Sequence, residues 1–175
     1  FSFNKLRGLD AYLSPEMKST GEAIGYDKKL HRAAYKAMIA SGITLRNYGT
    51  VLVSVADEDK EETLPLIRRF YNMGFNIEAT TLTGEVLREN GIRTRILHKP
   101  SEGSEEVLDS IRAGYVSYVI NTRAILSGKH FGDGVAIRQC AAQNNIAMLT
   151  NLDTVRMLLD VLEEVTLGIS TIDKR

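Results

Sequence analysis

Residues 50–56 read TVLVSVA, a run of strand-forming residues with no charge in it. The acidic turn that follows leads into a helical pattern at residues 60–73, with apolar residues such as Leu64 and Ile67 at the three- and four-residue spacing of an amphipathic helix. A short apolar strand followed at once by such a helix is typical of a βα unit in a parallel sheet. The first unit therefore predicts that further pairs of strand and helix follow.

The same alternation continues to residue 165. Four further strands are expected at residues 76–80, 94–98, 118–121 and 146–150, and four further helices at about 83–90, 103–113, 133–144 and 152–165. Gly74, Gly91 and Gly114 follow three of the helices, where a left-handed residue is favoured. The pattern predicts an α/β fold with an open five-stranded parallel sheet of the Rossmann type, flanked by helices. Such a sheet holds its ligand beyond the carboxyl ends of the strands, near the point where strand order reverses.

The first 48 residues follow a different pattern. A start punctuated by Pro and Gly precedes one long helical pattern at residues 27–41, whose apolar stripe needs a partner. The stripe consists of Leu30, Ala33, Ala34, Ala37 and Met38. A single helix with a short extended segment cannot close a hydrophobic core. We therefore expect residues 1–48 to be the tail of a preceding domain and residues 49–175 to form the α/β domain.

The composition of the 175 residues limits the classes of partner. Lys plus Arg and Asp plus Glu number 22 each, so the chain has no net charge that would attract nucleic acid or an acidic membrane. The sequence has no long apolar run and no signal-peptide pattern, and its one cysteine, Cys140, fits a reducing compartment. These features predict a cytoplasmic protein. The missing initiator Met indicates processing, or a piece cut from a longer chain.

Polar side chains gather where the predicted strands end. The carboxyl ends of parallel strands share one edge of a sheet, so these groups are expected to converge. Helix N-termini at that edge add N–H groups and a partial positive charge, and five or six hydrogen bonds of about 1.5–3 kcal/mol each suffice for micromolar binding of a charged group. The edge therefore predicts a phosphate-binding site. Its candidate residues are Ser54, Lys60, Thr80, Thr81, Thr83, Lys99, Asn121, Thr122 and Arg123.

Each candidate also has a purely structural interpretation. A threonine near a helix start, such as Thr80, Thr81 or Thr83, is a common N-cap, and Ser54 can hydrogen-bond the end of its own strand. Surface lysines are mostly only solvated. The convergence of several such groups is what distinguishes a binding site from this alternative.

Other sequence features carry little functional signal. His31, His98 and His130 lack the spacing of metal ligands. Cys140 lies on an apolar helical pattern, where a packed and inert thiol is expected. Residues 131–134, FGDG, are interpreted as a turn before a helix and match no cofactor fingerprint. We expect neither a metal nor a cofactor in this chain.

The acidic residues 57–59 raise the alternative of a phosphotransfer receiver domain, which shares the five-strand plan. That family places an Asp at the end of strand three and a Lys at the end of strand five. This chain has His98-Lys99 and Thr150-Asn151 at those places. Negative charge near a helix N-terminus explains the acidic run better.

Two groups of motifs resemble one known family. The first group is residues 1–5, FSFNK, and 14–22, SPEMKSTGE; the second is 53–60, VSVADEDK, 74–80, GFNIEAT, and 119–122, VINT. The first group resembles the end of the second ATP-grasp half of the large subunit of carbamoyl-phosphate synthetase. The second resembles the C-terminal allosteric domain of that subunit, which has the methylglyoxal-synthase fold. The resemblance covers essentially the whole chain.

The resemblance implies that the chain belongs to an ATP-dependent ligase, the glutamine-hydrolysing carbamoyl-phosphate synthase, and that this piece regulates instead of catalysing. The parent enzyme makes carbamoyl phosphate from glutamine-derived ammonia, bicarbonate and ATP, with Mg or Mn and a glutaminase small subunit expected. The effector implied is a phosphorylated metabolite such as UMP, IMP or phosphoribosyl pyrophosphate. The resemblance assigns Ser54, Lys60, Thr80, Thr83, Lys99 and Asn121 to the phosphate and sugar site, with Thr122 adjacent. The family usually carries Gly where this chain has Leu82, which predicts a change in affinity or effector choice.

Two alternatives stand beside the regulatory interpretation. Methylglyoxal synthase, the enzyme of this fold, is similar in its threonine-rich loop but needs Gly-Gly-Asp after strand three and an Asp after strand four for proton transfer. This chain has KPSEG at residues 99–103 and NTR at 121–123, so only Glu102 offers a carboxylate there. The second alternative is a docking module without a small-molecule ligand. The effector and its sign, the pathway (pyrimidine or arginine synthesis) and the oligomeric state stay open.

Overall fold

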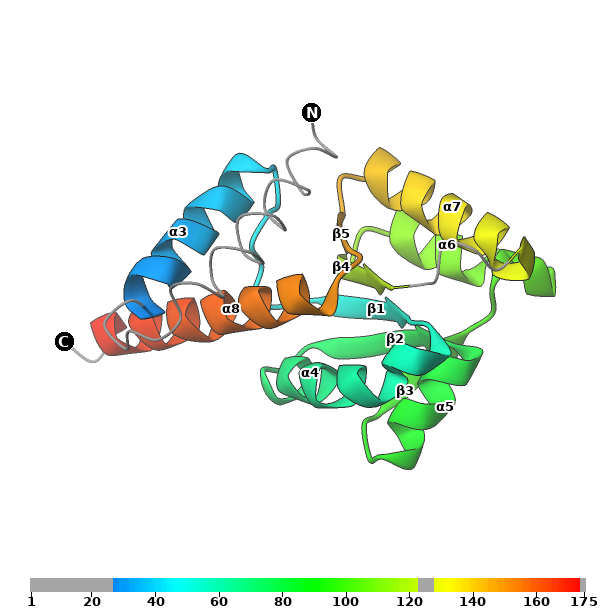
Figure 1. Ribbon diagram of the computed structural model, residues 1–175, viewed down its shortest axis with the longest axis horizontal. Helices are drawn as coiled ribbons and strands as arrows, with labels where there is room; N and C mark the ends of the chain where they lie inside the picture. The colour runs from blue at the N-terminus through cyan, green and yellow to red at the C-terminus, as the bar shows by residue number, and fades with distance from the viewer. Residues whose placement is uncertain (1–26, 123–127, 174–175) are drawn as a thin grey trace. The chain divides into compact units, whose positions relative to one another are not determined.

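The computed structural model describes residues 27–122 and 128–173, so the motifs at 1–5 and 14–22 and the candidate Arg123 lie outside the described residues (Figure 1). The chain forms two compact units. Tyr48–Leu152 make up the larger unit, and the described residues before and after it make up the smaller one. Among the described residues, no helix has the length and hydrophobicity of a membrane-spanning segment.

The larger unit contains a five-stranded sheet in which all neighbouring strands are parallel, in the order β3-β2-β1-β4-β5. The strands are β1 (Thr50–Ser54), β2 (Asn76–Thr80), β3 (Thr94–Leu97), β4 (Val116–Asn121) and β5 (Ala147–Leu149). The predicted open parallel sheet is therefore confirmed. Strand order reverses between β1 and β4. The β4 strand begins two residues earlier than predicted because Val116 already pairs with Thr50, across an irregularity in the register.

Helices connect the strands as the alternating pattern predicts. They are α4 (Lys60–Asn72), α5 (Thr81–Glu89), α6 (Glu106–Arg112) and α7 (Gly128–Gln143), with short 3-10 helices η2 (Asp57–Asp59) before α4 and η3 (Pro100–Glu102) before α6. The turn predicted at residues 131–134 was wrong, because these residues lie inside α7. Tertiary contacts made by Asp133 and Gly134 outweigh the low helix propensity of glycine at this point.

The sheet of the larger unit is covered on both faces, with α6 and α7 on one side and α4 and α5 on the other (Figure 1). Side chains alternate between the faces along each strand. Leu52 and Val119, paired in register, belong to the apolar cluster under α6 and α7. The neighbouring Tyr118 points to the opposite face, where the centroid of its ring lies 6.1 Å from the ring centroid of Phe70 on α4. Burial on both faces explains why the strand sequences are almost continuously apolar.

Gly49 closes the amino end of β1. Its φ of +110° is in the region that favours glycine, and a Cβ there would lie 2.2 Å from the Oγ of Ser117. The same Ser117 hydroxyl donates to the carbonyl oxygen of Tyr48 at 2.7 Å. Glycine is therefore required twice at this position, for its backbone conformation and for the close approach of β4.

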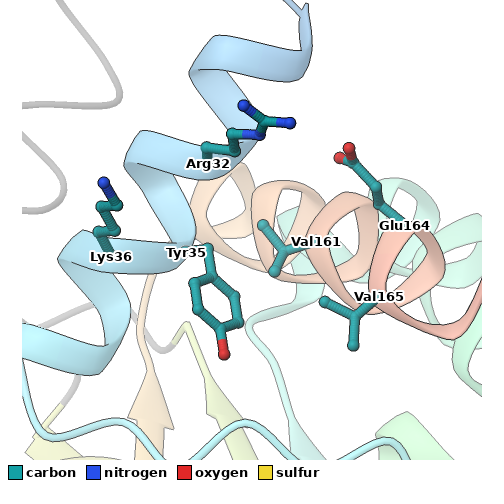
Figure 2. A pocket seen from close by; sticks show the side chains of 6 residues that line it. All are labelled: Arg32, Tyr35, Lys36, Val161, Glu164 and Val165. Carbon is teal, nitrogen blue, oxygen red and sulfur yellow. The ribbon is translucent and has the colours of Figure 1, made fainter. Parts of the chain in front are cut away.

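The smaller unit contains α3 (Asp27–Ala40) and nearly all of α8 (Leu152–Asp173). From the predicted apolar stripe of α3, Ala34 and Met38 are fully buried. Tyr35 of α3 lines a groove of about 230 Å³ together with Val161 and Val165 of α8 (Figure 2). The helix predicted at residues 27–41 is confirmed. The assignment of residues 1–48 to a preceding domain stays a prediction.

Candidate functional site

The ends of β1, β2 and β4 bring three of the predicted site residues together. Ser54 pairs in register with Asn121, and Thr80 follows the pair formed by Val53 and Ala79. Because side chains alternate along a strand, Ser54, Thr80 and Asn121 all point to the face that α6 and α7 cover. All three are at most 4% exposed. The carboxyl edge therefore has a buried row of two hydroxyls and one amide.

Thr80 does not use its hydroxyl to cap a helix. It occupies the N-cap position of α5, with the extended backbone expected there, but its side chain makes no capping hydrogen bond. Its Oγ1 donates to the Oγ of Ser54 at 3.0 Å instead. The simple N-cap interpretation of Thr80 is therefore wrong. The first-turn N–H groups of α5 receive no side-chain cap from this residue.

The other two threonines of the loop have different environments. Thr83 is 3% exposed, and its Oγ1 accepts a hydrogen bond from the N–H of Val55 at 3.3 Å, so it holds the end of β1 against α5. The Oγ1 of Thr81 is buried, and it has no hydrogen-bond partner among the described residues. Between them, Leu82 is 56% exposed. A buried hydroxyl without a partner costs about 1–3 kcal/mol, which makes Thr81 the residue of the loop most suited to a ligand.

The two predicted lysines lie beside this edge with different degrees of exposure. Lys99 follows β3, the strand next to β2, and is 8% exposed. Such strong burial is unusual for lysine and places a positive charge where few water molecules screen it. Lys60 begins α4 and forms an ion pair with Asp57 of η2. Its side chain is 13% exposed, so the acidic turn serves to hold a largely buried lysine.

Thr122 directly follows Asn121 at the end of β4. Its Oγ1 is buried and, within the described ranges, finds no hydrogen-bond partner. It resembles Thr81 in this respect, although the two lie on different strand ends. The predicted site residues that the structure describes are thus gathered at one edge of the sheet, with Thr83 and Lys60 engaged in local structural contacts.

Asp133 is a residue of this edge that sequence reasoning missed. It is 2% exposed, and its two carboxylate oxygens accept hydrogen bonds from the N–H of Ser101 at 2.8 Å and from the Ser101 hydroxyl at 2.6 Å. The next residue, Gly134, lies beside Asn121, and a Cβ added to it would be in ordinary contact with the Asn121 Nδ2 atom at 3.9 Å. Helix α7 therefore contacts both the loop that carries Lys99 and the end of β4. The available signal was an acidic residue between two glycines, Gly132 and Gly134, at the start of a predicted helix.

A family comparison agrees with this architecture. Residues 62–150 match the MGS-like domain family. The chain belongs to this family. The matched range begins in α4 and ends just after β5, so it includes the β2, β3 and β4 ends that carry Thr80, Lys99 and Asn121.

A solved structure shows the same fold. It is methylglyoxal synthase from Elizabethkingia anophelis NUHP1, with a TM-score of 0.56 and 18% sequence identity. The match covers 66% of this chain and 79% of the synthase chain. At this level of identity the likeness concerns the fold alone. The narrower assignment of this MGS-like domain to carbamoyl-phosphate synthetase stays a prediction.

The electrostatics of Glu102 bear on whether the MGS-like domain could catalyse proton transfer. Desolvation raises the pKa of Glu102, but hydrogen bonds from the Lys99 N–H and from His98, with the positive charges of His98 and Lys99, bring the pKa below its ordinary value of 4.5. The Glu102 Oε1 accepts from the Lys99 N–H at 3.2 Å, and its Oε2 lies 3.2 Å from His98 Nδ1. A general acid needs a raised pKa, so this carboxylate is better suited to fixing the turn.

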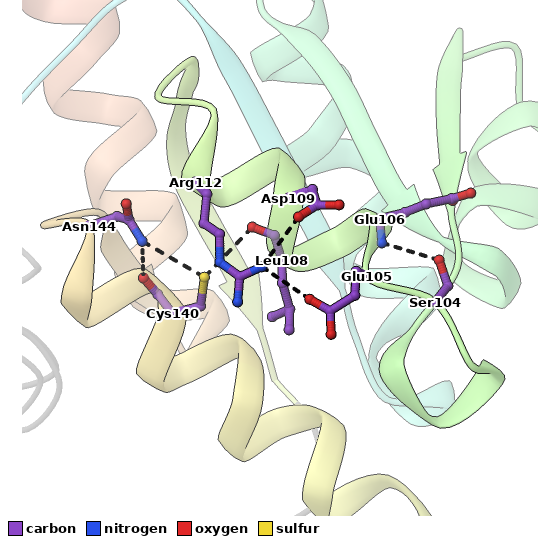
Figure 3. A network of polar contacts seen from close by, with 8 residues as sticks. All are labelled: Ser104, Glu105, Glu106, Leu108, Asp109, Arg112, Cys140 and Asn144. Carbon is purple, nitrogen blue, oxygen red and sulfur yellow. Dashed lines mark hydrogen bonds and ion pairs between the residues drawn. The ribbon is translucent and has the colours of Figure 1, made fainter.

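The lone cysteine of the MGS-like domain lies on α7 and faces α6 (Figure 3). Cys140 is 4% exposed, as predicted for a packed thiol, and its Sγ lies 3.7 Å from the carbonyl oxygen of Leu108. Nearby, Arg112 of α6 contacts Glu105 and Asp109 on the surface. Within residues 27–122 and 128–173, no group of three or more His, Cys, Asp or Glu side chains is placed to hold a metal ion.

Proposed function

We propose that this MGS-like domain is a regulatory module that binds a phosphorylated small molecule at the carboxyl edge of its sheet. One observation carries the proposal. The Thr81 hydroxyl is buried without a partner among the described residues, at the start of a helix whose N-cap residue, Thr80, hydrogen-bonds Ser54 instead. A phosphate oxygen at this place would satisfy both the hydroxyl and the first-turn N–H groups of α5.

The surrounding charges favour an anion of this kind. A helix N-terminus carries about half a positive charge, and the ammonium group of Lys99 adds a full charge at a strongly buried position. Hydrogen bonds to a charged group contribute about 1.5–3 kcal/mol each, so five or six of them reach micromolar affinity after the cost of association. Asn121 and Thr122, at the end of β4, offer an amide and a hydroxyl for the rest of the ligand, such as a sugar.

The polar groups of the edge support binding better than methylglyoxal-synthase-type catalysis. The two positions where proton transfer needs a carboxylate have Glu102, held ionised in a turn, and the Asn121-Thr122 pair. Asp133 is buried, but both of its oxygens are occupied by hydrogen bonds from Ser101. Its role is therefore to position the loop after β3.

The parent protein that fits this role is the large subunit of carbamoyl-phosphate synthetase, as the sequence motifs imply. In that setting the parent chain uses ATP with Mg or Mn, and UMP, IMP or phosphoribosyl pyrophosphate is the effector. An effector changes activity only through its different affinities for the active and inactive states, a coupling of about 1–3 kcal/mol. The regulatory effect on carbamoyl phosphate synthesis is therefore expected to be modest.

Isothermal titration calorimetry of the chain with UMP, IMP and phosphoribosyl pyrophosphate tests the proposal, with uridine as the control that lacks a phosphate. Saturable micromolar binding of at least one phosphorylated compound, and much weaker binding of uridine, is expected. Absence of saturable binding for all three would favour the docking module. Formation of methylglyoxal by the purified chain would favour the enzyme instead.

A further inference from the structure

The opposite edge of the sheet carries a cavity that the proposed effector site does not use. Its volume is about 590 Å³, within the range of sites for small ligands. It lies at the amino ends of β1, β2 and β3, whereas Ser54 and Thr80 end the first two of these strands. The lining residues are Gly49, Thr50, Tyr71, Asn76, Ile77, Glu78, Arg93, Arg95 and Tyr115.

Two arginines give this cavity a positive charge. Arg93 is exposed, and it makes no hydrogen bond or ion pair with any residue that the structure describes. The side chain of Arg95 is 68% exposed, and one of its nitrogens, NH1, lies 3.4 Å from Glu78 Oε2. Glu78 is the one acidic residue among the lining residues, so the two arginines leave the lining with a formal charge of +1. The cavity therefore favours an anion over a cation or a neutral molecule.

Buried Glu78 fixes the geometry of the wall. Its side chain is 6% exposed and accepts hydrogen bonds from the Tyr115 hydroxyl at 3.0 Å and from Ser110. Glu78 therefore holds the Tyr115 side chain in place before any ligand arrives, and Arg95 contacts the same carboxylate from a side chain that stays largely exposed. Such preorganisation lowers the entropic cost of binding.

Two tyrosines form partly exposed walls of the cavity. Tyr71 of α4 is 37% exposed and Tyr115 is 40% exposed, and both line the cavity, so part of each side chain is accessible. Aromatic rings pack well against other flat rings, and the planar guanidinium groups pair with carboxylate or phosphate oxygens through two hydrogen bonds. We propose that this cavity is a second binding site, for a small anion that carries a flat unsaturated ring.

An extended peptide added to the neighbouring edge strand fits the structure less well. The β3 strand is at the edge of the sheet, but the Nε of Arg88 donates to the carbonyl oxygen of Thr94 at 2.8 Å. This contact covers one of the backbone groups that an added strand would need. The cavity beside the strand, and not its backbone edge, is the recognition surface.

Simple probes separate the two features of the ligand. Benzoate has both a ring and a negative charge, benzamide has the ring without the charge, and acetate has the charge without the ring. Titration of the full chain, followed by the amide resonances of Asn76, Arg95 and Tyr115 in NMR spectra, is expected to give saturable millimolar binding for benzoate. Benzamide and acetate are expected to bind at least about fivefold more weakly, because each loses one class of contact.

Arg93→Gln tests the site without disturbing the buried network, because Arg93 is exposed. The substitution should weaken benzoate binding by about fivefold or more, and the matched control Arg138→Gln, an exposed arginine on α7, should leave it unchanged. Equal binding of benzamide and benzoate, equal affinity in Arg93→Gln, or no saturable shift would each overturn the proposal. Lys99→Ala should leave benzoate binding unchanged, because Lys99 does not line this cavity. The benzoate result therefore tests the cavity independently of the proposed effector site.

Discussion

Ser101 and Asp133 are 32 residues apart in the chain, yet both hydrogen-bond donors of Ser101 meet both carboxylate oxygens of Asp133. The contact joins the turn after β3 to α7 in the larger unit. Lys99 lies just before this turn, so the position of its backbone depends on the contact. A buried carboxylate that accepts two hydrogen bonds from one serine fixes the position of this turn against α7.

Asp133→Asn should lower the free energy of unfolding by about 1–2 kcal/mol, because both contacts with Ser101 lose the charge of the acceptor. The amide oxygen can still accept from the Ser101 N–H, whereas the Ser101 hydroxyl must turn from donor to acceptor to meet the NH₂ group. Urea denaturation measures the change. Asp109→Asn, at a carboxylate whose side chain is 68% exposed, is the matched control and should change stability by less than about 0.5 kcal/mol. Equal effects of the two substitutions would show that the contact is unimportant.

Thr81→Val and Thr80→Val should differ in their effects on stability, although the two threonines are adjacent. Valine replaces the Thr81 hydroxyl, which is buried without a partner among the described residues, so stability should hold or rise while phosphate affinity falls. At Thr80 the same change removes the hydrogen bond to Ser54 and should cost about 1 kcal/mol of stability. Urea denaturation and calorimetry on the same preparations give both quantities. A stability loss in Thr81→Val as large as in Thr80→Val would mean that Thr81 is structural.

Lys99→Ala should weaken binding of the phosphorylated effector by about tenfold to a hundredfold. The lost interaction is one charge-assisted hydrogen bond of about 1.5–3 kcal/mol at a strongly buried position. Calorimetry measures the affinity, and far-UV circular dichroism checks that the variant is folded. Lys36→Ala, at an exposed lysine of α3, should bind as the unsubstituted chain does. If both variants bound equally well, Lys99 would have no part in the site.

The turn after β3 should lose stability in acid. The folded-state pKa of Glu102 lies below its ordinary value of 4.5, because the hydrogen bonds and charges of Lys99 and His98 outweigh desolvation. A lowered pKa means that the ionised form stabilises the folded state, so this contribution is present above the ordinary value and is lost as pH falls through the folded pKa. The stability difference between the unsubstituted chain and Glu102→Gln should therefore shrink as pH falls below 4.5. A difference that grew with acidity would reverse the assigned sign.

The main features of the sheet were predictable because its signals are local. The run at Thr50–Ser54 is apolar and β-branched, and residues that end such a strand must lie at the carboxyl edge. The roles of Thr81 and Thr83 were not predictable, because α5 begins at Thr81 and residues two apart lie on different sides of a helix. Asp133 was missed for another reason. Its partner, Ser101, comes from a distant turn, and only the packed structure brings them together.

The most direct test of the central claim is the response of the α5 N-terminus to a phosphorylated ligand. Amide resonances of Thr81, Leu82 and Thr83 can be followed by NMR while UMP, IMP or phosphoribosyl pyrophosphate is added to the full chain. Large, saturable shifts of these three resonances are expected with at least one of the compounds, and none with uridine. Saturable binding that leaves all three resonances unmoved, with shifts only at the cavity lined by Arg93 and Arg95, would contradict a phosphate site at the start of α5.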